Sequence, residues 1–356
     1  MKKTLNKTKI ADFATYIGVV IAFIVMNALM NEGLLTRSMK GQLVPICCYI
    51  VMAVSLNLTV GILGELSLGH AGFMSVGAFT GVVTAMSLQS AIPSDGVRLA
   101  LAIVMGAIFA GIAGTLVGIP VLRLHGDYLA IVTLAFGEII KELINCLIIG
   151  HDKNGLHIIF NATGAKTVTD LGLTETGKVL IKGAQGATGT DTIASFTAGF
   201  ILIMVTLVVV LNLARSRSGR AIMALRDNRI AAESVGINVT KYKLMAFVTS
   251  AALAGGAGAL YGLNFSNLVS SKFDFNTSIL ILVFVVLGGL GNMWGSIIAA
   301  AVLTVLPEAL RGFADYRMLI YAIVLIVVML ATNSPQMKAL LSKLVPFGKK
   351  GEKEHA

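Results

Sequence analysis

The 356-residue chain contains a few ionisable side chains at places where its sequence is otherwise apolar. Glu65 and His70 stand in the glycine-rich segment 61–79, between two apolar runs. Ionisable groups within membrane-spanning segments are costly and usually face a protein interior or a water-filled path. We therefore expect both side chains to face the interior of a helix bundle or a pathway. The alternative is a short interfacial loop whose side chains reach water.

A second group consists of Glu138, Lys141 and Glu142, which interrupt the apolar run 128–149. Glu138 and Lys141 are three residues apart and so share one side of a helix, where they can pair. A structural ion pair is the simpler interpretation. A proton relay would need further acidic or histidine partners at depth in other runs, and the sequence offers none.

The sequence lacks recognisable motifs for catalysis or for a cofactor. It has no metal-ligand spacing, nucleophile elbow or dinucleotide fingerprint. Residues 172–178, GLTETGK, fit the first seven positions of a phosphate-binding loop, but Val179 follows where Ser or Thr is required, and no strand is expected before it. We expect no enzyme activity, bound cofactor or metal in this chain, so any energy input comes from elsewhere.

The composition predicts an all-α, polytopic membrane protein. Hydrophobic residues make up 56% of the chain and charged residues 13%, against about 45–50% and 25% in soluble domains. These values, with only three cysteines, exclude a soluble globule, a disordered chain and a disulfide scaffold. Nine apolar runs are long enough to cross or enter a membrane: 13–30, 43–64, 70–90, 99–120, 128–149, 193–213, 244–263, 277–306 and 318–332.

Basic residues at the ends of these runs predict the orientation of the chain. The net charge of +10 therefore indicates topology and contact with membrane lipid, and we expect no nucleic-acid partner. The basic segment 214–243 and the N-terminus are separated by six runs, which places both on the cytoplasmic side. The resulting division is a cytoplasmic N-terminus at 1–12, a membrane domain at 13–335, an extracytoplasmic loop at 150–192, a cytoplasmic loop at 214–243 and a basic cytoplasmic tail at 336–356.

The tail reaches the cytoplasm only if one of the last runs folds back. The run 277–306 is longer than a span needs and contains Gly288, Gly289 and Gly291. A helix broken there could re-enter the membrane.

An internal match suggests two related halves. Segments 102–118 and 246–262 share nine identical residues of 17 and would run in opposite directions, as in an inverted repeat. The alternative is that membrane helices rich in small residues resemble one another by chance. In both cases small residues recur every fourth position and favour close helix packing; these are Ala110, Gly114 and Gly118 in one segment and Ala254, Gly258 and Gly262 in the other.

Glycine-rich backbone in the membrane can leave the helical conformation only where it is buried in protein or lines a cavity. The candidate pathway-lining residues lie in two such segments, and they are Glu65, Ser67, Gly69, His70 and Gly72 in the first and Gly288, Gly289 and Gly291 in the second.

The loop 214–243 predicts an amphipathic helix. Ile222, Leu225, Ile230 and Val235 alternate with basic residues, and Gly236 is suited to end the helix. Such a helix can insert into a groove of a cytoplasmic partner or lie on lipid headgroups, and the residues alone do not separate these alternatives.

Four stretches resemble the LivM-type permease subunits of branched-chain amino acid ABC transporters, and the likeness spans most of residues 45–335. They are the later part of 65–79, GDYLAIVTLAFGEI at 126–139, the loop 218–247 and LGGLGNMWGSIIAAA at 287–301. The resemblance implies a bacterial inner-membrane permease of about 9–10 transmembrane or re-entrant helices. It further implies half of a translocation pathway for leucine, isoleucine or valine. The implied partners are a LivH-type permease, two cytoplasmic ATPases and an extracytoplasmic amino-acid-binding protein.

In ABC importers, a Glu-Ala-Ala pattern followed by glycine four residues later docks into the ATPase. Ala231, Ala232 and Gly236 match this pattern, but Ile230 occupies the acidic position and Glu233 is out of register. The resemblance therefore implies an ATPase-coupling loop that includes Gly219, Arg220, Ala231, Ala232, Glu233 and Gly236.

Three other functions stay open at this point. A related ABC permease for urea, amides or another small solute would share the same broad motifs. An ion-coupled secondary transporter would need no ATPase and could use Glu138 and Lys141. A purely structural membrane subunit is the third, although a scaffold has no need of glycine-broken membrane segments.

Overall fold

The computed structural model describes residues 2–33, 36–123, 127–152, 155–161, 168–171 and 177–310, with residues 322, 323 and 326. The chain forms two compact units, Met1–Ala301 and Val302–Ala356. All contacts reported below belong to the first unit. The predicted tail 336–356 and nearly all of the run 318–332 lie outside the described residues.

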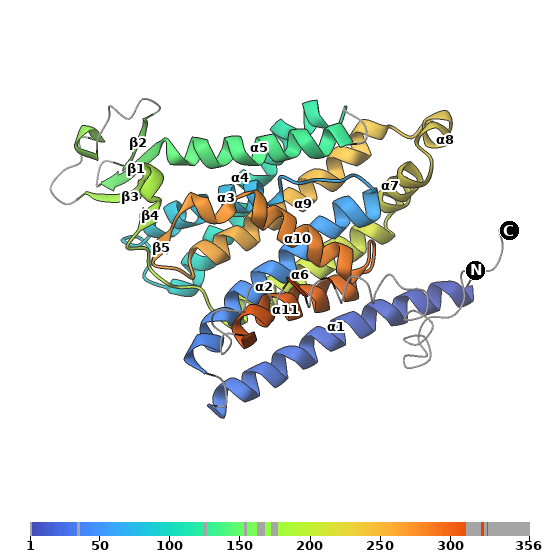
Figure 1. The fold of residues 1–356 in the computed structure, drawn as a ribbon, viewed down its shortest axis with the longest axis horizontal. Helices are drawn as coiled ribbons and strands as arrows, with labels where there is room; N and C mark the ends of the chain where they lie inside the picture. The colour runs from blue at the N-terminus through green and yellow to red at the C-terminus, as the bar shows by residue number, and fades with distance from the viewer. Residues whose placement is uncertain are drawn as a thin grey trace. The chain divides into compact units, whose positions relative to one another are not determined.

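Long apolar helices build most of the first unit (Figure 1). Within the part of the chain that the structure describes, five helical segments are long and apolar enough to cross a membrane. This confirms a polytopic helical membrane protein. The apolar helices are α1 (Lys2–Asn31), α2 (Arg37–Asn57), α3 (His70–Ser87), α4 (Asp95–Val121), α5 (Asp127–Asn145), α6 (Phe196–Arg215), α9 (Val239–Gly262), α10 (Phe275–Gly288) and α11 (Met293–Ala309).

Most predicted boundaries differ from the structure by a few residues, and three of the differences matter for the fold. The first helix begins at Lys2, because the lysines before residue 13 continue its helical backbone. The fifth ends at Asn145 rather than at 149, because the next residues form a strand. The run 277–306 is interrupted at residues 289–292, and Gly289 and Gly291 there have positive φ angles of 92° and 81°. The break predicted from the glycines is confirmed.

The segment predicted as a loop at 150–192 contains most of a small antiparallel sheet, which sequence analysis missed. Its strands are β1 (Leu147–Asp152), β2 (Gly155–Phe160), β3 (Lys178–Lys182), β4 (Ala187–Thr188) and β5 (Asn267–Leu268), in the order β2-β1-β3-β4-β5. The apolar residues of β1 directly follow α5, and a short apolar run cannot be told from the end of a helix by periodicity. The sheet lies at the opposite end of the first unit from α7 (Arg217–Asp227) and α8 (Arg229–Ser234) (Figure 1).

The core of the bundle is the interface between α4 and α9, which run antiparallel. A Cβ added at Gly106 would lie 2.9 Å from Ala259, and one at Gly114 would lie 2.6 Å from Ala251. The contacts of Gly118 lie still nearer to the start of α9. The opposite directions expected for segments 102–118 and 246–262 are therefore present, and their small residues allow the close approach. An evolutionary relation between the two halves stays a prediction.

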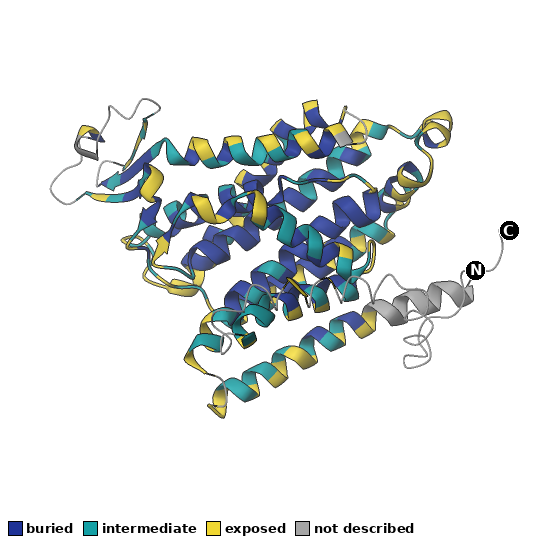
Figure 2. Ribbon diagram, in the orientation of Figure 1, coloured by how far each residue is buried: buried dark blue, intermediate teal, exposed yellow. Residues whose placement is uncertain are grey.

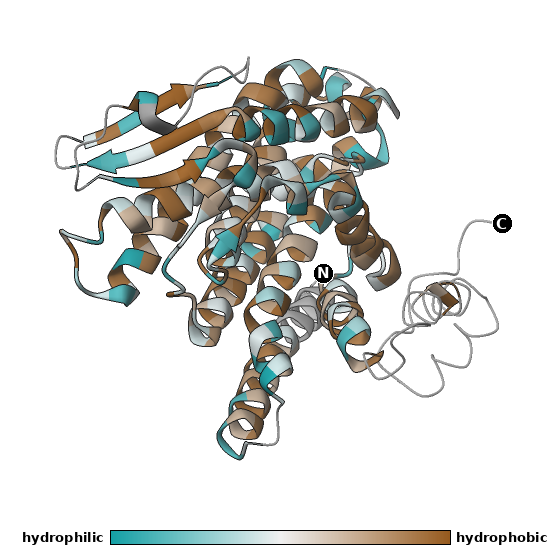
Figure 3. Ribbon diagram, turned by 60° about the vertical axis from the view of Figure 1, so that its left-hand side comes forward, coloured by the Kyte–Doolittle hydropathy of each residue, from teal (hydrophilic) through white to brown (hydrophobic). Residues whose placement is uncertain are grey.

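Burial and hydropathy separate the inner from the outer helices. Residues of α2, α3 and α9 are mostly buried, whereas residues 13–31 of α1 and the outward sides of α4 and α6 are mostly exposed or half-buried (Figure 2). The exposed positions of these outer helices are largely apolar, for example Ile112, Leu116 and Ile201. Figure 3 shows the same pattern, with hydrophobic residues along the helices and hydrophilic residues gathered at loops and turns. Exposed apolar side chains on long helices are suited to contact lipid.

Candidate functional site

The first interruption of the bundle is the non-helical segment 64–69. Helix α2 continues as a π-helix (Leu58–Leu63) and ends at Gly64, whose φ of 82° favours glycine. Residues 64–69 then leave the helical conformation until α3 starts at His70. Non-helical backbone of this kind was expected from the glycines. Ser67 and Gly69 are buried, whereas Gly64 and Leu66 are exposed, so protein covers the segment only in part.

His70 places the end of this segment deep in the bundle. The Ser55 hydroxyl lies 2.9 Å from the Met52 carbonyl oxygen, and it forms a hydrogen bond of 2.8 Å with His70 Nε2. Ser250 of α9 donates to the Ser55 carbonyl oxygen. At 1.5 Å per residue, Ser250 lies about 16 Å along α9 from Val239, where that helix begins. The prediction that His70 faces the bundle interior is confirmed, since the side chain is buried.

Glu65 is held by a basic residue of another helix. The Lys243 ammonium group, in the first turns of α9, donates to Glu65 Oε1. The exposed fractions of these side chains are 5% for Lys243 and 17% for Glu65. Pairing offsets part of the cost of two charges inside an apolar bundle, and removal of one partner would leave the other uncompensated. Glu65 is therefore an anchor of the segment 64–69.

Arg226 of α7 makes the second contact with this region. Its guanidinium Nη1 donates to the Gly61 carbonyl oxygen, and its side chain lies against Gly64. A Cβ at Gly291 would lie only 3.8 Å from the same Nη1. Arg226 therefore contacts the break at 64–69 and lies beside the break at 289–292.

Asn57 joins the two breaks to each other. Its Oδ1 accepts from the Gly291 N–H at 2.8 Å, and its Nδ2 donates to Ser296 Oγ at 2.9 Å and to the Asn292 carbonyl oxygen at 3.2 Å. Gly61 allows this contact, because a Cβ there would lie 1.8 Å from Asn57 Oδ1 and 2.3 Å from the Gly291 nitrogen. The two glycine-rich segments therefore form one connected region.

Most of the other candidate pathway residues are closely packed. Ser67 is buried, and its Oγ lacks a hydrogen-bond partner among the residues that the structure describes. Gly69 packs against the Thr133 carbonyl oxygen, and Gly72 lies opposite Gly137. Gly288 lies against Gly295 and Ser296, where a Cβ would be only 2.3–2.5 Å from the backbone. These glycines act first as close-packing residues, and their contact with a solute stays a prediction.

The loop 214–243 forms two helices rather than the single one that the sequence predicts. Asn228, with φ −156° and ψ 105°, ends α7 and caps α8 by accepting from the Ala231 N–H at 3.0 Å. An Asn side chain can satisfy the free N–H groups of a new helix, so it permits this break. Gly236 ends the second helix with φ 83°, as predicted, and the Ile237 N–H donates to the Ala232 carbonyl oxygen at 3.1 Å.

The break at Asn228 separates apolar residues that the sequence places on one helix face. Ile222 and Leu225 of α7 are buried against the bundle. Ile230 is 80% exposed on α8, and Val235 just after α8 is 75% exposed. The second pair therefore forms an exposed apolar tip on a basic segment. Such a tip is suited to insert into a protein groove.

The remaining residues of the predicted coupling loop have structural contacts. Gly219 packs against the Leu213 and Ala214 carbonyl oxygens, where a Cβ would be 2.2–2.3 Å away. Arg220 donates to the Arg215 carbonyl oxygen at 3.2 Å. Glu233 pairs with Arg229 at 3.0 Å, and both side chains are partly exposed. Unlike the mostly buried pair of Glu65 with Lys243, the pair of Glu233 with Arg229 lies at the surface, where an ion pair contributes little to stability.

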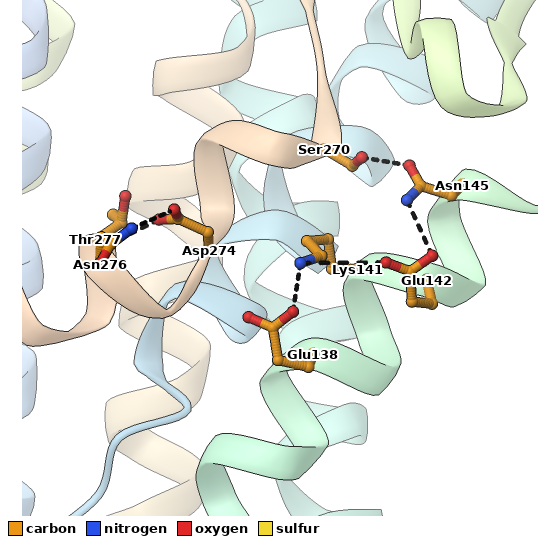
Figure 4. A network of polar contacts seen from close by, with 8 residues as sticks. All are labelled: Glu138, Lys141, Glu142, Asn145, Ser270, Asp274, Asn276 and Thr277. Carbon is orange, nitrogen blue, oxygen red and sulfur yellow. Dashed lines mark hydrogen bonds and ion pairs between the residues drawn. The ribbon is translucent and has the colours of Figure 1, made fainter.

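Glu138 and Lys141 form the ion pair that their spacing predicts (Figure 4). Lys141 also lies 4.0 Å from Glu142. Opposite them, Asp274 caps α10 by accepting from the Thr277 N–H and the Asn276 amide, both at 2.9 Å. Partial burial acts to raise the pKa of the Asp274 carboxyl, but these hydrogen bonds and the charge of Lys141 outweigh it and hold the pKa below its usual value.

The described residues contain no group of three or more His, Cys, Asp or Glu side chains that could hold a metal ion. Sequence analysis missed Asn57, Arg226 and Lys243 as parts of the site. Arg226 and Lys243 were counted only as basic residues that set the orientation. No spacing could have paired Lys243 with Glu65, because 178 positions separate them in the sequence.

Comparison with known proteins is consistent with this architecture. A family model described as a branched-chain amino acid transport system permease component matches residues 39–330. The chain is 34% identical over 292 residues to the high-affinity branched-chain amino acid transport system permease protein LivM of Escherichia coli strain K12, which covers 79% of this chain and 66% of that protein. The chain therefore spans just under two thirds of the length of this relative.

More distant relatives are permeases of two kinds. The chain is 22% identical over 289 residues to the permease protein LivH of Salmonella typhimurium, which covers 79% of this chain and 88% of LivH. It is 28% identical over 142 residues to the fructose import permease protein FruG of Bifidobacterium longum, which covers 37% of this chain and 42% of FruG. No solved structure matches the chain significantly.

Proposed function

The chain belongs to the family of permease components of branched-chain amino acid transport systems, and from this premise we propose that it forms half of the membrane pathway of an ATP-driven importer. The proposed solutes are leucine, isoleucine and valine. The proposed partners are a LivH-type permease, two cytoplasmic ATPases that hydrolyse the ATP, and an extracytoplasmic binding protein. The proposed location is the inner membrane of a bacterium.

The observation that carries the coupling role is the exposed tip of the segment α7–α8. Ile230 and Val235 are exposed at this tip although each is a large apolar residue. Arg217, Arg220 and Arg226 on α7 support a cytoplasmic position for this end of the bundle, because basic residues are enriched in cytoplasmic membrane loops. An apolar tip on the cytoplasmic side is suited to an ATPase groove, and Gly236 lets the chain turn back directly behind it.

The contacts behind the tip support a route from the ATPase to the pathway. Movement of α8 would pull α7, and Arg226 would carry that movement to Gly61 and Gly64. On the other side of α8, Lys243 at the start of α9 holds Glu65. The two basic residues that flank the tip therefore hold the same non-helical segment from two helices. Asn57, which accepts a hydrogen bond from Gly291, would transmit this movement to the break at 289–292.

The first test of this proposal is to extract the tagged protein gently from its native membrane and to identify what accompanies it by mass spectrometry. We expect a second multi-span permease and ATPases that carry phosphate-binding loops. Isolation of the chain alone, with uptake that survives ATP depletion and collapses with an ionophore, would instead establish an ion-coupled transporter.

The same preparation tests the docking tip. Ile230→Asp puts a charge into the proposed groove, so we expect it to reduce ATPase recovery at least tenfold while the permease partner is retained. Ile158→Asp is the matched control, because Ile158 is an equally large exposed residue on β2 at the other end of the unit. Equal ATPase recovery with both variants would show that the tip is not the docking site.

Competition assays test the proposed solutes. We expect unlabelled leucine, isoleucine and valine to inhibit uptake of labelled leucine, and urea, acetamide and fructose not to inhibit it. Fructose is included because a fructose import permease is among the relatives. Inhibition by urea or acetamide alone would assign the chain to a permease for those solutes.

A further inference from the structure

The outward side of α5 carries charged residues within the length of the helix. Glu138 and Glu142 are 36% and 66% exposed, and Lys141, the ion-pair partner of Glu138, is 20% exposed. At 1.5 Å per residue, Glu138 lies about 16 Å along α5 from Asp127 and about 10 Å from Asn145. Charged groups at such depth are costly in hydrocarbon, so this side of α5 faces protein or water.

The outward sides of α4 and α6 have the opposite character. Helix α4 has no charged residue from Leu99 to Val121, and α6 has none from Phe196 to Ala214. Their exposed residues include large apolar ones such as Ile112 and Val208. These two helices are suited to contact lipid. The chain therefore has one side that lipid suits and another that it does not.

The non-helical segment 64–69 passes through the bundle beside α5. Near its start, Glu65 pairs with Lys243, which lies about 6 Å along α9 from Val239 at 1.5 Å per residue. At its other end, α3 starts at the level of Ser250, about 16 Å along α9 from the same point. The segment therefore follows α9 for about 10 Å without helical conformation.

Both breaks present backbone at the surface. Gly64 and Leu66 are exposed in the first break, and Leu290, Gly291 and Asn292 are exposed in the second. N–H and C=O groups outside a helix lack the regular partners that a helix provides, and hydrocarbon offers none. These exposed parts therefore need protein or water, as the outward side of α5 does.

Hydrogen bonds join these features into one surface. The Leu68 N–H donates to Thr133 Oγ1 of α5 at 3.0 Å, and the Ala71 N–H donates to Ser278 Oγ of α10 at 3.1 Å. Figure 4 shows the start of α10 opposite the charged residues of α5. We call this surface the α5–α10 face. It consists of the outward side of α5, α10 and the exposed parts of the two breaks.

We propose that the α5–α10 face is the contact face for the second permease subunit of the importer, which rests on the proposed function of the chain. The ATPases and the binding protein of that proposal contact the two ends of the bundle, so neither reaches the middle of α5. The second permease is the proposed partner that lies at membrane depth. It covers charged groups and exposed backbone that lipid would leave without partners.

The charges on α5 specify the chemistry of the partner's surface. Two carboxylates, those of Glu138 and Glu142, are exposed beside one ammonium group, that of Lys141. An interface that covers them needs a counter-charge, because an unpaired charge is costly where water is excluded. The second permease therefore presents a basic side chain at the level of Glu142.

This face gives the coupling route an end point. The segment 64–69 belongs both to the coupling route, through Glu65, and to the α5–α10 face, through Leu66. Movement of the segment would change the surface against which the second permease packs. Movement driven by the ATPases would thereby reach the boundary between the two permeases.

Photo-cross-linking in the native membrane tests the face directly. The photoreactive residue p-benzoylphenylalanine replaces Ile139 of α5 or Val286 of α10, one position at a time, in the tagged protein. Ile139 is 52% exposed and is matched by Ile112 of α4, which is 51% exposed. Val286 is 42% exposed and is matched by Val208 of α6, which is 44% exposed. After irradiation, mass spectrometry identifies what is joined to the chain.

We expect the probes at positions 139 and 286 to form at least ten times more adduct with the second permease than the two control probes form. The adduct is counted per molecule of second permease recovered, so a probe that weakens assembly does not lower the count by itself. The control probes should react with lipid.

A charge reversal tests the basic group of the partner by a separate readout. We expect Glu142→Lys to lower recovery of the second permease after gentle extraction at least tenfold, because two basic groups would then face each other. Glu32→Lys is the matched control. Glu32 is also an exposed glutamate, and it follows α1 on the other side of the unit from α5 (Figure 1). The cross-linking test does not depend on this variant.

The possible results are distinct. Adducts with a second copy of this chain, adducts with its own segment 318–332, or equal adducts from all four probes would overturn the α5–α10 face. Equal recovery of the second permease with Glu142→Lys and Glu32→Lys would overturn the basic partner group. Absence of any second permease beside the unmodified chain would overturn the proposed function, and the face with it. Adducts with the second permease from positions 139 and 286 alone support the face.

Discussion

Glycine has opposite effects in two regions of this protein. At the interface of α4 and α9, glycines at positions such as 106 and 255 remain helical and allow two backbones to pack closely. Between α2 and α3, Gly64 adopts a positive φ angle and helps to end the helix. In the first region glycine lets α4 and α9 pack closely, whereas the second region is non-helical backbone held by Arg226 and Lys243. The same residue type therefore marks both a close-packed helix interface and a break between helices.

The largest expected effect is on the charge pair that holds the non-helical segment 64–69. Glu65→Gln leaves the Lys243 ammonium group buried without a counter-charge, and we expect it to destabilise the protein by about 3–5 kcal/mol. Thermal unfolding in nanodiscs measures the change. The double variant Glu65→Gln with Lys243→Met removes both charges, and it should recover most of the lost stability. A double variant as unstable as the sum of the two singles would mean that the pair does not act as a unit.

The second prediction concerns the close-packed interface of α4 and α9. Gly255→Ala would place a Cβ 2.2 Å from the Ala110 Cβ and 2.5 Å from the Gly106 carbonyl oxygen. We expect a loss of about 3 kcal/mol, because overpacking against backbone cannot relax easily. Gly256→Ala is the matched control one residue later, where the added Cβ meets atoms only at 3.6 Å or more.

Thermal unfolding of the two variants compares these neighbouring sites directly. Gly256→Ala should be neutral or slightly stabilising, since Ala has the higher helix propensity. Equal midpoints for both variants would show that α4 and α9 do not pack as closely as described.

The smallest stability effect is expected at the connection between the two breaks. Asn57→Ala removes the hydrogen bonds to Gly291, Asn292 and Ser296. We expect a loss of about 1–2 kcal/mol, because these are bonds between neutral groups. Hydrogen exchange at the amide of Gly291 should also become faster, since that N–H loses its acceptor. Unchanged exchange there would contradict a link through Asn57.

The local features of the site could be predicted from the sequence, whereas its contacts could not. Gly236 ends a helix, the glycines at 288–291 break one, and Glu138 pairs with Lys141, because each of these depends on neighbours within a few positions. The partners of Glu65 and Gly61 are Lys243 and Arg226, which come from distant parts of the chain. A basic residue near a membrane helix predicts orientation equally well with or without such a partner.

Two fold features were missed for a related reason. The apolar residues of β1 continue the apolar run of α5, so nothing in their type separates the strand from the helix. The break at Asn228 depends on the packing of Ile222 and Leu225 against the bundle, while Ile230 on α8 stays exposed. Tertiary packing decides both features, and periodicity in a single segment does not report it.

The most direct test of the coupling route is the number of leucine molecules transported per ATP hydrolysed in proteoliposomes, compared between wild type and Arg226→Ala. Arg226 carries the contact from α7 to Gly61. The account predicts continued ATP hydrolysis with at least a tenfold lower ratio in the variant, because the ATPases would move α8 without moving the segment 64–69. A ratio equal to that of wild type, with Arg226 replaced, would contradict the account.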